Sequence, residues 1–277
     1  MVLINNIIEK SYPLLKKNGN NFRQIIHFNI EKTEIIPGQF YMLNYYGCQK
    51  PFSVFSYNKI NNYIDEIGFI IEQRGECSKK IINAREGDYF GLTGPLGNGF
   101  DIKNYENYLL IGGGIGIAPI LFLANYLLIN KKSISILLGE RKEDNIIYNE
   151  TINNIVNSDK TNLIIYTDDG SIGKKGFVTK DLEKVIKENN FDSVCICGPE
   201  IMMNKAIELI NDRIKNIQIC MERYMKCGLG ICGSCVLDNI GLRVCSEGPV
   251  FNYGSTLINC KEFGNYHRNS NGIIKEL

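Results

Sequence analysis

Four cysteines near the carboxyl end of the chain are spaced as the ligands of an iron–sulfur cluster are. Cys227, Cys232 and Cys235 follow one another with four and then two residues between them, and Cys245 stands ten positions after Cys235. This C-x4-C-x2-C…C pattern is typical of a plant-type 2Fe–2S cluster, in which four thiolates hold two irons. Such a cluster carries one electron at a time, so the pattern predicts a metal centre that transfers electrons.

Glycines alternate with these cysteines where the chain must bend most sharply. Three thiolates from one short loop have to point at the same cluster, which requires a tight curl with inward-facing amides. Gly228, Gly230 and Gly233 lie between the ligands, and glycine tolerates the left-handed backbone angles of such a curl. Inward N–H groups also offset the negative charge of a cluster and tune its potential.

Other uses of four cysteines fit the spacing less well. Structural zinc sites usually pair two C-x2-C motifs across a longer loop, whereas Cys245 stands alone here. Disulfide frameworks suit small secreted chains, and this chain has 277 residues. We expect the remaining cysteines to be small core residues. They are Cys48, Cys77, Cys195, Cys197, Cys220 and Cys260.

Length, charge and composition narrow the class of protein. A chain of 277 residues predicts two domains with a small appendage, and its net charge of +1 without a basic stripe argues against a nucleic-acid partner. Residues 108–129 carry no charge, but glycines and Pro119 divide them into strand, turn and helix, so we expect no membrane span. Residues 1–10 lack the pattern of a secretory signal, and free thiols suit a reducing compartment. We therefore expect a cytoplasmic protein.

The pattern of secondary structure changes at about residue 103. Before it, short β-rich runs separated by turn signals predict a barrel, with a short helix starting after Cys77. Between 103 and 217, strands alternate with helices, which predicts a parallel sheet with right-handed crossovers. Residues 218–277 carry the cluster motif. The expected strands are 23–30, 39–45, 52–57, 63–72, 109–111, 134–138, 163–167 and 194–197, and the expected helices begin at Ala118 or cover 179–188 and 200–215.

A glycine-rich turn between a strand and a helix predicts a dinucleotide site. Glycine lets a pyrophosphate approach the backbone, and a helix N-terminus offers free amides and a favourable dipole. The alternative is a tight turn that only packs the helix on the sheet. The glycines of this turn are Gly112, Gly113, Gly114 and Gly116.

Two further motifs gain meaning only from their surroundings. Cys197, Gly198 and Pro199 end another strand at the same edge of the sheet, so they are expected to flank the same pocket; alone, they form an ordinary turn. In the barrel half, a cation, an aromatic ring and a hydroxyl occur together and suit the phosphate, the ring and a ring nitrogen of a flavin. A proline turn before a strand is the alternative there. This second motif is Lys50, Pro51, Phe52 and Ser53.

These motifs, in this order, resemble the ferredoxin–NADP reductase superfamily, which has a flavin barrel followed by a nicotinamide domain. Residues 220–235, 241–245 and 247–251 closely resemble the electron-transfer subunits of dihydroorotate dehydrogenase B, and so do 167–171 with 176–179. The resemblance covers essentially the whole chain, and the cluster segment is its most specific part.

The resemblance implies an FAD-binding barrel in residues 1–102, an NAD-binding α/β domain in 103–217 and a 2Fe–2S segment in 218–277. It implies a catalytic partner that carries FMN and oxidises dihydroorotate, in a heterotetramer of two plus two chains. Electrons would pass from this partner through the cluster and FAD to NAD+, as a step of de novo pyrimidine (UMP) biosynthesis. Related assemblies remain alternatives: a hydrogenase, a sulfite reductase or a ferredoxin:NADP oxidoreductase. A zinc-binding interaction module is the non-enzyme alternative.

The resemblance also assigns roles to individual residues. The four cysteines of the motif would hold the cluster, and Gly112–Gly116 with Cys197–Pro199 would contact the nicotinamide nucleotide. Lys50 stands where the superfamily usually has arginine, and Phe52 where it has tyrosine; Cys77 and Ser78 replace a small residue and threonine. The residues that would line FAD are Lys50, Pro51, Phe52, Ser53, Phe69, Ile70, Ile71, Cys77 and Ser78.

No acid–base residue is required by this chemistry, so none is expected. His27 and His267 are expected to be structural or surface residues. Asp168 and Asp169 would repel a 2′-phosphate and thus favour NAD over NADP, unless they only form a turn. The exposed rim of the cluster loop is expected to be the docking face for the partner, with apolar contacts from Met225, Leu229 and Ile231.

Overall fold

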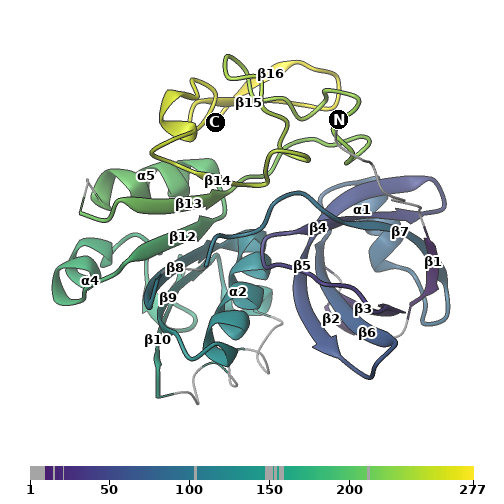
Figure 1. Ribbon diagram of the computed structural model, residues 1–277, viewed down its shortest axis with the longest axis horizontal. Helices are drawn as coiled ribbons and strands as arrows, with labels where there is room; N and C mark the ends of the chain where they lie inside the picture. The colour runs from purple at the N-terminus through teal and green to yellow at the C-terminus, as the bar shows by residue number, and fades with distance from the viewer. Residues whose placement is uncertain are drawn as a thin grey trace.

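The computed structural model describes residues 10–14, 16–20, 22–102, 105–146, 152, 155, 159–210 and 213–277. Residues 1–9, where the sequence predicts no secretory signal, lie outside them. Figure 1 shows an antiparallel barrel beside an α/β part, with the carboxyl-terminal segment lying across the top of both. This architecture confirms the predicted fold class, a β-barrel followed by a parallel-sheet domain and a small terminal segment.

The barrel consists of antiparallel strands in the order β1-β7-β4-β5-β6-β3-β2. The predicted strands are confirmed as β3 to β6, whereas the sequence does not predict β1, β2 or β7. In β7, a Cβ atom on Gly94 would lie 2.5 Å from the ring of Tyr41, so glycine is needed there for packing. The bounds are β1 (Lys10–Pro13), β2 (Lys16–Gly19), β3 (Arg23–Glu31), β4 (Phe40–Tyr45), β5 (Cys48–Lys59), β6 (Ile64–Glu72) and β7 (Tyr89–Leu96).

A short helix, α1 (Glu76–Ile82), follows β6. The prediction that it starts after Cys77 is wrong, because the first turn forms around Gly75. The Ser78 hydroxyl accepts the backbone N–H groups of Arg74 at 2.8 Å and of Gly75 at 3.0 Å. The serine therefore sits inside the first turn and not at its start.

The second part is a sheet in the order β11-β10-β9-β8-β12-β13-β14, parallel except for β14. Its predicted strands are confirmed, and its last two predicted helices are shorter than expected. The elements are β8 (Asn107–Gly113), η1 (Gly114–Gly116), α2 (Ile117–Ile129), β9 (Ser133–Glu140), η2 (Glu143–Asn145), β10 (Thr161–Thr167), β11 (Lys174–Lys175), α4 (Leu182–Glu188), β12 (Ser193–Cys197), α5 (Glu200–Ile210) and β13 (Asn216–Cys220).

The carboxyl-terminal segment returns to this sheet before it ends. β14 (Val250–Asn252) pairs antiparallel with β13, so the terminal segment adds a strand to the sheet. The predicted boundary after residue 217 falls inside β13. After β14 come η3 (Leu257–Asn259) and a hairpin of β15 (Tyr266–Arg268) and β16 (Ile274–Glu276). The cluster cysteines lie in the irregular chain between β13 and β14.

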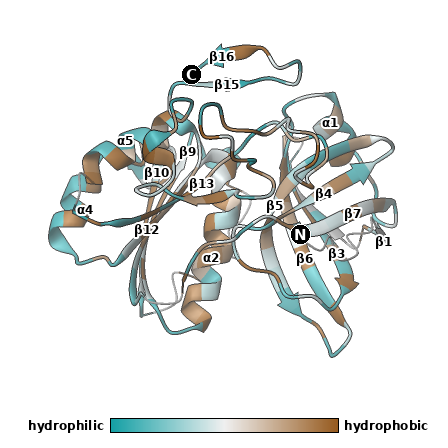
Figure 2. Cartoon of the chain, turned by 45° about the horizontal axis from the view of Figure 1, so that its top comes forward, coloured by the Kyte–Doolittle hydropathy of each residue, from teal (hydrophilic) through white to brown (hydrophobic). Residues whose placement is uncertain are grey.

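Three apolar clusters form the core. One fills the barrel, and the other two cover opposite faces of the parallel sheet, one with α2 and one with α4 and α5. α2 lies between the sheet and the barrel, and Figure 2 shows that it is apolar along much of its length. Its Phe122 belongs to the barrel cluster and contacts Tyr57 edge to face.

Among the described residues, no helix has the length and the apolar character that crossing a membrane requires. The uncharged residues 108–129 are divided between β8, η1 and α2.

Phe69 gives a direct test of the barrel core. Its side chain is fully buried and contacts the rings of Phe28 and Tyr41, with centroids 6.2 Å and 5.8 Å away. We expect Phe69→Ala to lower the free energy of unfolding by about 3–5 kcal/mol, measured by chemical denaturation. Tyr63→Ala, at a side chain that is 81% exposed, is the control and should change it by less than about 0.5 kcal/mol. Loss of flavin with unchanged stability in the Phe69 variant would contradict this assignment.

Candidate functional site: a cofactor cavity beside a four-cysteine loop

A cavity of about 600 Å³ lies where the barrel, the parallel sheet and the carboxyl-terminal segment meet. The first turn of α1 and the start of β5 form its barrel side, and the N-terminus of α2 forms its sheet side. The chain between β13 and the cluster cysteines closes it. Its predicted lining residues are Lys50, Pro51, Phe52, Ser53, Ile70, Cys77, Ser78, Gly116 and Cys197.

Two residues predicted to line the flavin point elsewhere. Phe69 and Ile71 are fully buried in the barrel core, whereas Ile70 between them faces the cavity. Successive side chains of a strand point to opposite faces, and all three are apolar, so the sequence gives no sign of which face is the barrel interior. The side chains of Phe69 and Ile71 therefore support the strand from inside.

The glycine turn and the Cys-Gly-Pro turn pack directly on each other. A Cβ atom on Gly116 would lie 2.5 Å from the backbone nitrogen of Gly198 and 2.6 Å from the carbonyl group of Cys197. A Cβ atom on Gly198 would lie 2.9 Å from the Gly113 carbonyl oxygen. The alternative interpretation, glycine for tight packing, therefore holds at Gly116 and Gly198.

Gly114 is different from its neighbours in the turn. Its φ is +55°, and a Cβ atom there would meet nothing within 4 Å. The turn is thus open on the side of Gly114, at the carboxyl edge of the sheet where nucleotides bind in α/β folds. Of the two turns, Ile115, Gly116 and Cys197 line the cavity, whereas Gly112, Gly113, Gly114, Gly198 and Pro199 are not among its lining residues.

The charges in the cavity single out Lys50. Arg74 pairs with Glu72 at 2.8 Å and with Glu222 at 3.4 Å. Among the described residues Lys50 has no carboxylate partner; its Nζ atom lies 4.6 Å from the centre of the Tyr224 ring. A lysine that borders a cavity without an anionic partner suits the phosphate of a bound cofactor.

The other two cavity arginines are paired within the protein. Arg223 lies between Glu200 and Glu262, its Nε atom 2.5 Å from a Glu262 oxygen. Arg268 pairs with Asp238 at 2.9 Å. The charges of Arg223 and Arg268 are therefore compensated by carboxylates of the protein, whereas Lys50 has no such partner among the described residues.

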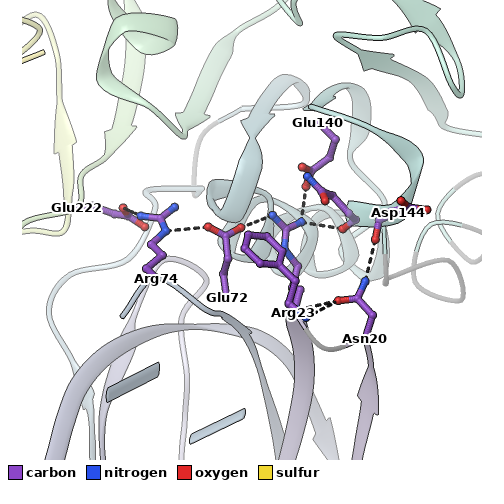
Figure 3. Close-up of polar contacts among 9 residues, drawn as sticks. Asn20, Arg23, Glu72, Arg74, Glu140, Asp144 and Glu222 are labelled. Atoms are coloured by element: carbon purple, nitrogen blue, oxygen red, sulfur yellow. Dashed lines mark hydrogen bonds and ion pairs between the residues drawn. The ribbon is translucent and has the colours of Figure 1, made fainter. Parts of the chain in front are cut away.

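A chain of charged side chains runs from the buried boundary between barrel and sheet to the wall of the cavity, which Glu72, Arg74 and Glu222 line (Figure 3). Arg23 contacts Glu140 on the sheet side at 2.5 Å and also Glu72 at the end of β6. Glu72 in turn accepts a hydrogen bond from Arg74, which reaches Glu222 of the carboxyl-terminal segment. These contacts connect all three parts of the chain. No motif in the sequence indicates them, because the partners are distant along the chain.

The four cysteines of the motif lie together and form two pairs. Cys227 lies beside Cys232 and Cys235 beside Cys245, so that the two sulfurs of each pair interact electrostatically, and the amide of Cys245 donates to Cys235 Sγ at 3.4 Å. Among the described residues no group of three or more His, Cys, Asp or Glu side chains surrounds a single ion position. Two pairs of thiols fit two bridged irons, each with two cysteines, better than one zinc ion.

Backbone amides of the cluster loop point at these sulfurs. The amide of Leu229 donates to Cys227 Sγ at 3.4 Å, and that of Gly230 donates to Cys245 Sγ at 3.1 Å. Gly228, Gly230 and Gly233 have φ values of +72°, +73° and +70°. These left-handed angles produce the curl and explain the glycines between the ligands.

The loop favours thiolates at two of its positions. Burial raises the pKa of Cys232, but its interactions with Ser234 and with Cys227 outweigh burial and bring the pKa to about 6. The hydrogen bond from Cys245 lowers the pKa of Cys235 to about 7. The pKa of Cys245 itself is raised, because its proton serves that bond. Deprotonated sulfur is the form that binds iron.

The structure also places residues whose roles the sequence left open. His267, expected to be structural or at the surface, lines the cavity from the terminal hairpin, and Tyr224 lines it three residues before Cys227. Asp169 accepts hydrogen bonds from the backbone and hydroxyl of Ser171, so it forms a turn, whereas the Asp168 side chain is exposed.

The apolar residues of the cluster loop also differ from one another. Ile231 is 72% exposed, Leu229 is half-buried and Met225 is buried. Of the three, only Ile231 is available as a large apolar contact on the rim.

Comparison with known proteins agrees with this geometry. Residues 222–256 match the iron–sulfur cluster binding domain of dihydroorotate dehydrogenase B, and residues 110–208 match an oxidoreductase NAD-binding domain. The structure resembles that of an NADH-dependent reduced ferredoxin-NADP oxidoreductase, with 27% identity, a TM-score of 0.76, and 94% of this chain and 93% of that chain covered. It also has the fold of a ferredoxin NADP+ reductase from Neisseria gonorrhoeae, at 18% identity and a TM-score of 0.57, with 73% of this chain and 90% of that chain covered.

Curated relatives cover most of the chain. A protein of Methanocaldococcus jannaschii, named as a probable electron transfer subunit of dihydroorotate dehydrogenase B (NAD+), is 40% identical over 85% of this chain and 86% of its own. A protein of Pyrococcus furiosus with the same name is 41% identical over 89% of this chain and 91% of its own. On this identity and coverage, the chain belongs to the family of electron transfer subunits of dihydroorotate dehydrogenase B (NAD+).

Proposed function

We propose that the chain transfers electrons from dihydroorotate, oxidised by an FMN-containing catalytic partner, through a 2Fe–2S cluster and FAD to NAD+ in de novo pyrimidine biosynthesis. One observation carries this proposal: the chain segment that holds the cluster cysteines also forms part of the wall of the cofactor cavity. Tyr224 and Met225 line the cavity, and Cys227 follows two residues later. We further propose a cytoplasmic complex of two chains of each kind.

FAD fits the cavity between barrel and sheet. It exchanges electrons singly or in pairs, which an exchange between a one-electron cluster and a two-electron nicotinamide requires. Lys50 would hold its phosphates, and Phe52 and Ile70 would give the ring an apolar wall. Ser78 shapes the loop before α1, since its hydroxyl accepts two amides of that loop and donates to the Gly75 carbonyl.

The residues of the two other sites have separate tasks. Cys227 with Cys232 and Cys235 with Cys245 would each hold one iron, and the Leu229 and Gly230 amides would stabilise the negative charge on the sulfurs. At the sheet edge, the open turn at Gly114 would admit the pyrophosphate of the nicotinamide nucleotide. Asp168 would disfavour a 2′-phosphate, so we propose NAD and not NADP.

A second candidate is a subunit of a ferredoxin:NADP oxidoreductase assembly. The likeness to the NADH-dependent reduced ferredoxin-NADP oxidoreductase over 94% of the chain favours it. The two candidates differ in the electron donor, and the following experiment separates them.

Reconstitution with the catalytic partner tests the main proposal. We expect the purified pair to reduce NAD+ with dihydroorotate, and the complex to have the mass of two chains of each kind. Cys235→Ala should abolish this activity through loss of the cluster, while reduction of the flavin by NADH persists. If the partner alone is as active as the pair, or if only reduced ferredoxin supports NAD+ reduction, the proposal is wrong.

Lys50→Met tests the phosphate contact. The substitution keeps the aliphatic stem and removes the charge, so we expect the Kd for FAD to rise by about tenfold or more. Fluorescence titration measures it, and the affinity for riboflavin, which has no phosphate, should not change. Lys205→Met on α5, at an exposed ion pair with Glu208, is the control. Equal losses for FAD and riboflavin would show that Lys50 does not meet a phosphate.

Gly114→Ala tests the open turn. The positive φ costs about 1–2 kcal/mol for any side chain, and a methyl group there would also keep the pyrophosphate from the backbone. We expect the Kd for NADH to rise by about tenfold, or 1.4 kcal/mol, measured by calorimetry. Gly87→Ala, at φ +91° and also with nothing within 4 Å, is the control that places a side chain at another positive φ away from the site. An equal effect of both variants on NADH binding would contradict the assignment.

A further inference from the structure

Arg23 is a buried charge that joins the two halves of the molecule. It begins β3 of the barrel, and its side chain is 2% exposed. One terminal nitrogen, Nη1, lies 2.5 Å from a carboxylate oxygen of Glu140 and 2.8 Å from the carbonyl oxygen of Asn145, both on the sheet side. The other, Nη2, binds Glu72 of the barrel. The guanidinium is thus shared between two parts that pack on each other mainly through apolar side chains of α2 and the barrel.

The same turn of the barrel makes a further contact across this boundary. The Asn20 side-chain oxygen accepts the backbone N–H of Arg23 at 2.8 Å, which orients the start of β3. The Asn20 amide donates to the carbonyl oxygen of Asp144 at 2.8 Å. Asn20 and Arg23 together therefore hold the chain that follows β9, as Figure 3 shows.

Both partners of Arg23 lead directly into a cofactor-binding loop. Glu72 ends β6, and Arg74 to Ser78 beyond it form the loop before α1 and the start of this helix in the flavin cavity. Glu140 ends β9 at the carboxyl edge of the parallel sheet, and its carbonyl oxygen accepts the amide of Asp168 at 3.1 Å. A single guanidinium thus connects the loop of one cofactor to the edge that binds the other.

Stability alone is a weak reason for this arrangement. A buried ion pair pays a large desolvation penalty, and apolar residues of equal volume are often as stabilising or more so. Arg23 Nε is buried without a hydrogen-bond acceptor among the described residues, so the group is not optimised for energy. The planar guanidinium of Arg23, with its two carboxylate partners, does specify the direction and distance between the parts that it joins. Apolar packing specifies these poorly.

We propose that Arg23 is a positioning residue that sets the nicotinamide edge of the sheet against the flavin cavity for hydride transfer. This inference rests on the proposed function. In the step, the C–H bond of the dihydronicotinamide breaks, its hydride bonds to the oxidised flavin and NAD+ remains. Hydride transfer needs reacting atoms about 3–3.5 Å apart, and a 1 Å displacement can cost about 100-fold in rate. Two cofactors on separate parts of a chain meet that tolerance only if the parts are fixed to each other.

The test is rapid-mixing reduction of the bound flavin by NADH. In Arg23→Met we expect the limiting rate to fall by about tenfold or more, with the Kd for NADH and the flavin and iron contents changed less than about twofold. Arg23→Lys keeps the charge without the fork and should lie between Met and wild type. Arg23→Met leaves the buried carboxylate of Glu140 and the partly buried one of Glu72 with less compensation. Arg23→Met/Glu140→Gln therefore provides a second variant, expected to fold and to remain slow.

Hydrogen exchange of the apo-protein gives a readout that is independent of turnover. We expect faster exchange in residues 140–145 and 72–78 of the Arg23 variants. Lys132→Met, which removes an ion pair with Glu106 inside the sheet part, is the matched control and should change neither rate nor exchange.

Two results would overturn the inference: a limiting rate within about twofold of wild type in Arg23→Met/Glu140→Gln, or equal losses in rate, NADH affinity and flavin content. Failure of the wild-type protein to reduce its flavin with NADH would instead overturn the proposed function.

Discussion

The flavin cavity and the glycine turn at the sheet edge both depend on the burial of α2 between the parallel sheet and the barrel. The helix carries no charged residue, and nine of its residues are buried, on all sides of its axis. A helix that is apolar all round must be covered all round, and one layer of sheet covers only one side. The barrel supplies the other cover, with Phe122 packed in the barrel core. This packing places the N-terminus of α2 beside β5 and creates the cavity, whose sheet side includes Ile115, Gly116 and Ala118.

The packing of α2 explains why residues 108–129 are uncharged, a feature that hydropathy alone would relate to a membrane span. The apolar character of residues 108–129 serves a buried strand followed by a helix with two partners. The turn between them has to be narrow, because the Cys197–Gly198 backbone lies against Gly116. The glycines of such a turn thus have two causes, close packing at Gly116 and an open, left-handed backbone at Gly114. A sequence motif cannot separate these causes, since both require the absence of a side chain.

The sequence predicts best what depends on local spacing. The cysteine intervals, the alternation in the barrel strands and the strand–turn–helix order are local, and they predict the fold class and the cluster loop. The lining of the cavity by Ile70 and not by Phe69 or Ile71 depends on which face of β6 meets the barrel interior, and three apolar residues in a row carry no such information. The sequence does not indicate the places of Arg23, Tyr224 and His267 in the structure, because the residues around each of them are distant along the chain.

The three parts of the chain are joined pairwise by contacts of specific geometry. Arg23 links the barrel to the carboxyl edge of the parallel sheet through Glu72 and Glu140. Arg223 links the start of α5, which follows the Cys-Gly-Pro turn, to the terminal segment through Glu200 and Glu262.

The third pair of parts, the barrel and the carboxyl-terminal segment, is joined by the ion pair of Arg74 with Glu222 and by a close backbone contact. Gly228 of the cluster loop lies on the barrel so closely that a Cβ atom there would be 2.6 Å from Met42 Cγ. Apolar burial drives the parts together but tolerates sliding, whereas a fork between two carboxylates or a backbone in contact with a side chain does not. Electron and hydride transfer depend on distance, so we infer that these three joints, more than the core, set the relative positions of cluster, flavin and nicotinamide.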